Sequence, residues 1–311
     1  MAVPLTTAGF PDVLDPRFQE IRDGLEDRPE DKISEFFNVV NSTIEVERGS
    51  ALTPMGNFQQ FSGDGGSGTV PYDGPDQGYD WNATHIEWAL GIQIERRLWQ
   101  FDQFNVIDGR MENLVDSAFE TRQGHAAGVA FNDSFSASSS FYNHTESVAI
   151  FSNSHTTLRP GVSTSSGFDN LVTSALSPAA LSSARTQARL LRDDAGRRRG
   201  FEPDALVVPV DLEYRALEIM QTQKGLDSAD QNKNILAGKF RVIPWQYIDD
   251  TNDWFLVNTA KMKKNLSMYE ATPTEFARVE DFDTLIAEFR GYMTYTFGRA
   301  DWRFGVGAQV S

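Results

Sequence analysis

The chain has 311 residues, of which 40% are hydrophobic and 12% aromatic, a composition typical of a folded protein with one large core or two smaller ones. It contains no cysteine, which excludes disulfides, thiolate metal sites and cysteine nucleophiles. The formal net charge is −16, from 44 acidic and 28 basic residues, so the chain as a whole repels nucleic-acid phosphates. No stretch approaches the roughly 18 consecutive apolar residues of a membrane span, and the N-terminus resembles no export signal.

The first fifty residues predict an arm rather than a separate domain. Asp15 can cap a helix that has Pro16 at its first position. A second apolar group follows, and the alternating residues 42–48 then predict a strand.

Residues 62–80 are rich in glycine and aspartate and predict a loop of nearly twenty residues, which is unusual in a compact domain. The strict alternation of residues 86–95 predicts a strand on the order of 30 Å long. Paired with residues 55–61, this strand would form a long two-stranded arm with the glycine-rich loop at its tip. An isolated ribbon is marginally stable in water, so the pattern implies a partner surface.

Residues 108–131 carry apolar side chains at helical spacing and predict a long amphipathic helix with Asp108 as its cap. The Ser-, Thr- and Asn-rich residues 132–168 indicate a transition between domains. A second helix is expected to begin at Ser177 and Pro178.

The C-terminal third predicts a mixed α+β domain. Residues 205–210 indicate a buried strand, and Asp211 can cap a helix from Leu212 to about Gln221. Strands are expected at 240–243 and 254–257, and a helix near 283–289. Residues 291–297 and 302–307 are expected to form a closing hairpin around a turn at 298–301.

Known catalytic and cofactor motifs are mostly missing. Gly63, Gly65 and Gly68 match a dinucleotide fingerprint, but the prolines and glycine that follow leave no helix to bind a pyrophosphate. The four histidines lack the spacing of a helical zinc site, and neither a serine-hydrolase elbow nor a phosphate-binding loop is present. Asp73, Asp76 and Asp80 are weak evidence for a bound cation. We therefore expect no catalytic residues, no metal site and no cofactor.

One basic cluster stands out in this acidic chain. Arg197, Arg198 and Arg199 follow a helix that carries Arg185 and Arg189. These arginines either form a solvated surface that pairs with the neighbouring aspartates 193 and 194, or contact an acidic neighbouring subunit.

The order of the predicted parts resembles the HK97-like fold of tailed-phage major capsid proteins. In detail, residues 151–155, the helix after Ser177, PDALVVP at 203–209 with its helix, and residues 241–256 and 295–305 are similar to the Mu-like major head subunit family. The resemblance implies an N-terminal arm at 1–50 and an E-loop with root strands at 51–103. It also implies a peripheral domain at 104–150 and 261–311, with a spine helix, and an axial domain at 151–260.

The resemblance further implies a structural protein without enzymatic activity, which assembles as pentamers and hexamers into an icosahedral virion shell in the bacterial cytoplasm. Its partners would be other copies of itself, with portal, scaffold or decoration proteins, and the shell would enclose double-stranded DNA without reading its sequence. The arm and E-loop would lie over neighbouring subunits, with no membrane involved. The expected interface residues are Phe61, Trp81 and Trp88 in addition to Arg185, Arg189, Arg197, Arg198 and Arg199.

Two other functions remain open at this point. An encapsulin-type compartment would have a similar fold and enclose an enzyme, whereas an acidic hydrolase with paired carboxylates would be a monomer or a small oligomer. Shells that are welded by isopeptide bonds use a lysine in the E-loop, and this chain has no lysine between Lys32 and Lys224. Lysine cross-linking of that type is therefore not expected.

Overall fold

The computed structural model describes residues 31–63, 66, 68–70, 72–74, 76–95, 97, 106–138, 141, 144–222, 234–281 and 286–310. The helix expected after Asp15 lies outside these residues. The chain forms two compact units: unit 1 has its described residues at 31, 86–124 and 271–295, and unit 2 at 32–85, 125–270 and 296–310. Within the described part of the chain, no helix has the length and apolar composition needed to cross a membrane.

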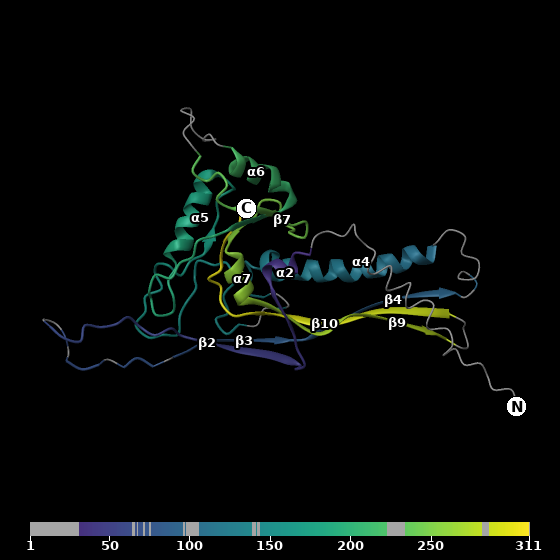
Figure 1. Ribbon diagram of the computed structural model, residues 1–311, viewed down its shortest axis with the longest axis horizontal. Helices are drawn as coiled ribbons and strands as arrows, with labels where there is room; N and C mark the ends of the chain where they lie inside the picture. The colour runs from purple at the N-terminus through teal and green to yellow at the C-terminus, as the bar shows by residue number, and fades with distance from the viewer. Residues whose placement is uncertain are drawn as a thin grey trace. The chain divides into compact units, whose positions relative to one another are not determined.

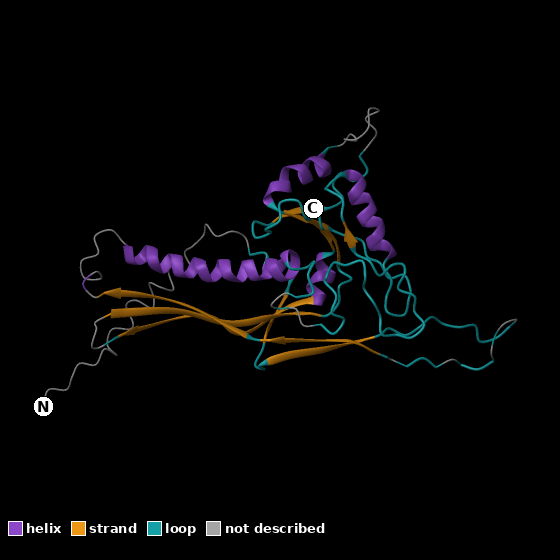
Figure 2. Cartoon of the chain, turned by 180° about the vertical axis from the view of Figure 1, so that it is seen from behind, coloured by secondary structure: helices purple, strands orange, loops and turns teal. Residues whose placement is uncertain are grey.

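Unit 1 is built from long strands and a long helix. Strand β4 (Ile86–Glu95) pairs antiparallel with β10 (Ile286–Arg299), and β10 lies between β4 and β9 (Leu266–Glu280). Helix α4 (Val106–Ala127) runs along these strands (Figure 2). Ile94 of β4 packs with Met111 and Leu114 of the helix, and Ile92 packs against the same cluster. The predicted strand 86–95 and the predicted long helix are thus confirmed, although α4 begins before Asp108, which is therefore not its cap.

Unit 2 contains a five-stranded sheet with the order β5-β11-β8-β6-β7. Helices α5 (Pro178–Leu190) and α6 (Glu213–Gln221) belong to the same unit (Figure 1). The strands are β5 (Leu171–Val172), β6 (Ala205–Val208), β7 (Arg241–Pro244), β8 (Trp254–Val257) and β11 (Gly305–Ala308).

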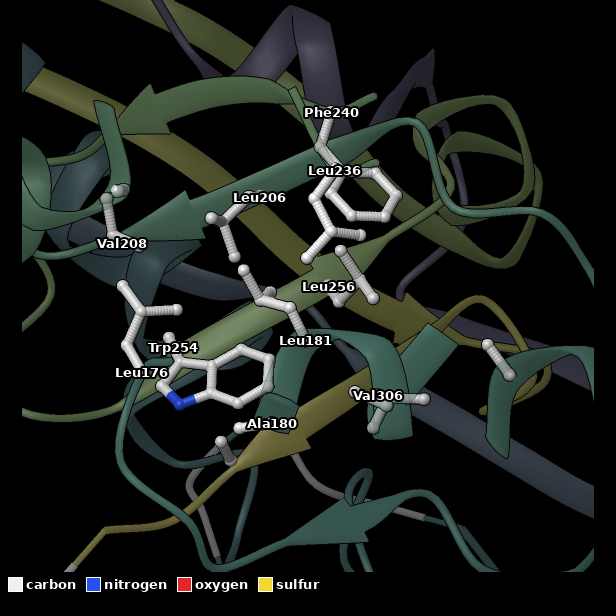
Figure 3. Close-up of a cluster of buried hydrophobic side chains, with 14 of the residues drawn as sticks. Leu176, Ala180, Leu181, Leu206, Val208, Leu236, Phe240, Trp254, Leu256 and Val306 are labelled. Carbon is white, nitrogen blue, oxygen red and sulfur yellow. The ribbon is translucent and has the colours of Figure 1, made fainter. Parts of the chain in front are cut away.

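The alternation of side chains across this sheet creates two apolar layers. One layer contains Leu206, Trp254 and Val306 with Leu181 of α5 and Ile219 of α6 (Figure 3). The opposite layer is aromatic, because the rings of Phe131, Phe135 and Phe151 lie 4.7, 5.6 and 5.4 Å from that of Phe255. The central strands are therefore buried on both faces, which is why they read as continuous apolar runs.

Smaller elements complete unit 2. Helix α2 (Ile33–Phe36) precedes β1 (Asn38–Asn41), which pairs in parallel with residues 267–270 of β9. Strands β2 (Val46–Leu52) and β3 (Gln77–Thr84) form an antiparallel hairpin. The remaining elements are the π-helix η3 (Gly128–Asn132), the 3₁₀ turn η4 (Val210–Leu212) and α7 (Thr259–Asn265).

Four further predictions are wrong in detail. Strand β4 pairs with β10 and not with residues 55–61, so the hairpin below the glycine-rich loop consists of β2 and β3. Residues 286–289 belong to β10 rather than to a helix. Strands β10 and β11 lie in different sheets and form no hairpin. Asp211 lies in η4 and does not cap α6.

Candidate functional site

The β2–β3 hairpin carries a long loop with exposed apolar side chains. Leu52, at the end of β2, is 73% exposed, and Phe58 and Phe61 within the loop are 107% and 52% exposed. The base of the loop is closed by Thr53, whose hydroxyl donates to the Asp76 carbonyl at 2.8 Å and accepts from the Asp76 amide at 3.0 Å. The stem of the loop is thus held by hydrogen bonds, while large apolar side chains beyond it are exposed to water. Exposed apolar side chains of this kind are typical of a surface that binds another protein.

An ion pair holds one side of the loop against the rest of unit 2. The Arg159 guanidinium donates to both carboxylate oxygens of Asp73, at 2.7 and 2.8 Å, and to the Pro54 carbonyl at 2.8 Å. The hydrogen bond from Arg159, followed by one from the Gly56 amide, lowers the pKa of Asp73. Asp73 therefore serves to anchor the loop.

The aspartates considered for a cation site do not converge. Asp76 acts through its backbone at the stem, and Asp80 accepts from the Gln77 side-chain amide at 3.0 Å. Hydrogen bonds from Ser50 and then Gln77 lower the pKa of Asp80. No cluster of three metal-ligating side chains occurs among the described residues.

Of the three aromatic residues expected at an interface, only Phe61 is exposed. Trp81, on β3, is partly buried and its ring stacks on Tyr269 with centroids 5.9 Å apart. Trp88, on β4, stacks on Tyr295 at 6.1 Å. Both tryptophans thus pack within the chain, and an additional interface role for them remains a prediction.

The arginines form two intramolecular networks. Arg185 and Arg189 both contact Glu202, at 2.5 and 3.4 Å. In the turn after α5, Arg197 pairs with Asp193 at 2.8 Å, whereas Arg199 lies 3.8 Å from the same carboxylate and is 66% exposed. Arg198 is also exposed. The pairing of this cluster with Asp193 agrees with the solvated-surface interpretation, and Arg189, Arg198 and Arg199 remain exposed to a partner.

Sequence reasoning missed a buried charged cluster in unit 2. The His155 ring stacks on Trp302 with centroids 3.8 Å apart, and its Nδ1 lies 3.0 Å from the Glu146 carboxylate. Glu146 also accepts from the Thr156 amide at 3.0 Å. Arg303 covers Trp302 at 4.4 Å and pairs with Asp194.

His144 contributes little charge beside this cluster. Burial, followed by repulsion from Arg299, lowers the pKa of His144 to about 4. The neutral imidazole of His144 lies next to the Glu146 carboxylate, which binds His155.

A second missed feature is a charged cavity of about 390 Å³ in unit 2. Four cations line it, and so do four carboxylates: Arg199, Lys261, Lys264 and Arg303, with Glu146, Asp193, Asp194 and Asp301. A sequence signal existed, because three of the seven lysines of the chain lie in α7, TAKMKKN. We call this feature the α7 cavity.

One of the comparisons with known proteins identifies a family. The model of a family described as phage capsid protein matches residues 82–308. A search of curated proteins finds no match.

Solved structures with the same fold include three phage or phage-like shells. The capsid of cyanophage P-SCSP1u has a TM-score of 0.60 at 8% identity and covers 90% of this chain and 88% of its own. The mature capsid of bacteriophage PhiM1 has a TM-score of 0.59 at 10% identity, with 91% and 88% covered. The capsid of an empty GTA particle has a TM-score of 0.57 at 12% identity, with 91% of both chains covered.

Proposed function

The chain belongs to the phage capsid protein family, and from this membership we propose that its copies assemble as pentamers and hexamers into an icosahedral shell around double-stranded DNA. The protein is a structural major capsid protein of the virion, with the α+β fold of HK97-type capsids. The single observation that carries the proposal is the family match over residues 82–308. An encapsulin-type compartment and a carboxylate hydrolase are not favoured.

The exposed loop supports assembly through contacts between copies. A two-stranded ribbon such as β2–β3 is only marginally stable in water, and its loop exposes Phe58 and Phe61. Covering these groups with a neighbouring copy removes apolar surface from water, and the same contact repeats around a closed shell. We therefore assign residues 51–103 to the E-loop and its root strands, with Phe61 as the first interface candidate.

The remaining residues are assigned to the other domains of an HK97-type capsid protein. Residues 1–50 form the N-terminal arm, and α4 takes the place of the spine helix in the peripheral domain, residues 104–150 and 261–311. Residues 151–260 form the axial domain. We add β11 to the axial domain, because Gly305–Ala308 pairs with β8 in the five-stranded sheet.

The partners and the site of assembly complete the proposal. The shell forms in the host cytoplasm, contains a portal, and uses separate scaffold or decoration proteins. The net charge of −16 suits an enclosure that holds DNA without binding it. We propose no enzymatic activity and no lysine cross-link in the E-loop.

Electron microscopy of the expressed protein tests the proposal. Purified chains are expected to form closed particles of uniform size in negative stain. A chain that sediments only as a monomer or small oligomer, even when co-expressed with its neighbouring genes, would refute the shell. Particles that package an enzyme instead of DNA would support the encapsulin alternative.

A further inference from the structure

Unit 2 exposes apolar side chains at the start of α6. Val210 is 52% exposed, and Tyr214, in the first turn of the helix, is 84% exposed. The acids beside them, Asp211 and Glu213, have no ion-pair partner within the part of the chain that the structure describes. A large aromatic ring in water next to unpaired carboxylates is typical of a surface that binds another protein.

The start of α6 lies at one end of the five-stranded sheet. Strands β6 and β7 run parallel and both end there, and the antiparallel β8 begins there. Residues 209–218 and 245–253 follow directly after β6 and β7, belong to unit 2, and together contain six acidic residues and one arginine. That residue, Arg215, pairs with Glu218 at 2.6 Å, so the other five acids keep their charge in excess. We call this the acidic end of the sheet.

The opposite end of the same sheet is basic. Residues 185–204 lead from the second half of α5 to the start of β6, and residues 259–264 follow β8. These two segments, also in unit 2, contain nine basic and four acidic residues. The four acids, at positions 193, 194, 202 and 204, already contact Arg197, Arg303, Arg185 and Thr259 in turn. We call this the basic end of the sheet.

The basic end also presents an exposed apolar side chain among its arginines. Leu190, the last residue of α5, is 46% exposed. Arg189 beside it shares one carboxylate with a second arginine, Arg198 is exposed, and Arg199 is 66% exposed. The two ends therefore match, because each offers exposed apolar groups beside charges, and the charges are of opposite sign.

We propose that, in each pentamer and hexamer, the acidic end of one copy binds the basic end of the next copy. Tyr214 packs near Leu190, and the carboxylates beside Tyr214 pair with Arg198 and Arg199. Because two different surfaces meet, the contact is heterologous, and its repetition around an axis closes a ring. The inference rests on the proposed shell function and identifies a contact inside the rings of that shell.

Disulfide trapping tests the contact, because the chain has no cysteine of its own. Val210→Cys is combined in turn with Thr186→Cys, Leu190→Cys or Arg198→Cys, which leaves Tyr214 and the unpaired acids in place. After assembly and oxidation, non-reducing gels are expected to show covalent ladders that end at five and six chains, because each chain is joined to two neighbours. The single-cysteine variants are the controls, and they can give no product larger than a dimer.

The outcomes separate this contact from the proposed function. If microscopy shows closed particles but none of the three cysteine pairs gives products beyond a dimer, the shell stands and the contact is overturned. If the wild-type chain forms no particles, the proposed function fails, and the contact fails with it.

Charge reversal gives a second measurement. Asp211→Lys with Glu213→Lys, and separately Arg198→Glu with Arg199→Glu, are each expected to lower the yield of closed particles more than about tenfold, because like charges then face each other. The variant with all four changes should recover most of the yield. Its recovery would also show that the two lysines do not unfold α6. Equal yields from the wild type and both double variants would overturn the proposal.

A compensated control separates the contact from the net charge of the chain. Arg48→Glu with Arg290→Glu, at two exposed positions outside both ends of the sheet, is added to the two lysines at 211 and 213. This variant has the net charge of the wild type, but its acidic end is still reversed, so no recovery of particles is expected. Recovery as complete as in the variant with exchanged charges would overturn the proposal.

Discussion

Glu146 is a buried carboxylate that is held by hydrogen bonds. Burial alone would raise the pKa of Glu146, but the hydrogen bond and charge of His155, with the Thr156 amide, outweigh it and leave the pKa below the ordinary 4.5. A lowered carboxyl pKa means that the stabilisation is fully present above pH 4.5 and is lost as the pH falls through the folded-state pKa.

We therefore expect Glu146→Gln to reduce the free energy of unfolding by about 2 kcal/mol at pH 7, because a charge-assisted bond becomes a neutral one. Urea unfolding at a series of pH values measures the difference, which should shrink on acidification. Glu275→Gln, at an exposed position of β9, should change stability by less than about 0.5 kcal/mol. A constant difference between Glu146→Gln and wild type from pH 7 down to acid would contradict the assignment.

Gly298 lies where two aromatic rings approach the backbone. A Cβ at this position would lie 2.7 Å from Trp81 and 2.9 Å from Tyr269. Gly298→Ala is therefore expected to lower stability by about 1–3 kcal/mol, the usual effect of overpacking. Thermal unfolding measures it, and Gly124→Ala in α4, where a Cβ meets no atom within 4 Å, should be neutral or stabilising. Equal losses in both variants would argue against the close packing of Trp81.

At the scale of elements, α5 shows what a local cap contributes. The Ser177 hydroxyl accepts from the Ala180 amide at 3.1 Å, and Pro178 occupies the first turn. Ser177→Ala should cost about 1 kcal/mol of unfolding free energy, measured by urea denaturation. Ser183→Ala, in the exposed middle of the same helix, should be slightly stabilising, because alanine favours helix. A smaller loss for Ser177→Ala than for Ser183→Ala would contradict the capping role.

Elements with local signals could be predicted from the sequence, and their partners could not. The cap at Ser177 and the alternation of residues 86–95 each act within a few residues, and both predictions are confirmed. The partner of β4 lies almost two hundred residues away in β10, and alternation alone specifies which face is buried, not which strand pairs. The same reason explains why β10 and β11, close in sequence, were wrongly placed in one hairpin.

Tertiary pairing also overrides local periodicity near the end of the chain. Ile286 and Phe289 are spaced as in a helix, yet both lie in β10, opposite Glu95 and Ile92 of β4. The buried cluster was equally hidden, because His155 meets Glu146 nine residues away and Trp302 from the far end of the sequence. The α7 cavity was easier to predict from the sequence, because three of the seven lysines of the chain lie in α7.

At the scale of the whole molecule, the loop of the β2–β3 hairpin keeps large apolar side chains in water. The β2–β3 stem is closed by hydrogen bonds between Thr53 and Asp76, while Phe58 and Phe61 beyond it remain in water. Because these side chains bury little surface within the single chain, their contribution to stability is expected in the assembled shell. Mutations in the loop should therefore prevent shell assembly without unfolding the single chain.

Deletion of residues 62–75 tests this separation, because it leaves β2, β3 and the bonds of Thr53 intact. The variant loses the solvent-exposed ion pair of Asp73 with Arg159, which contributes little to stability in water, so its circular dichroism and unfolding should stay close to wild type. Negative-stain microscopy should show no closed particles. A second variant, in which the same residues become a Gly/Ser segment of equal length, separates the role of the sequence from that of loop length. Normal particles from the deletion would remove the loop from the contacts that close the shell.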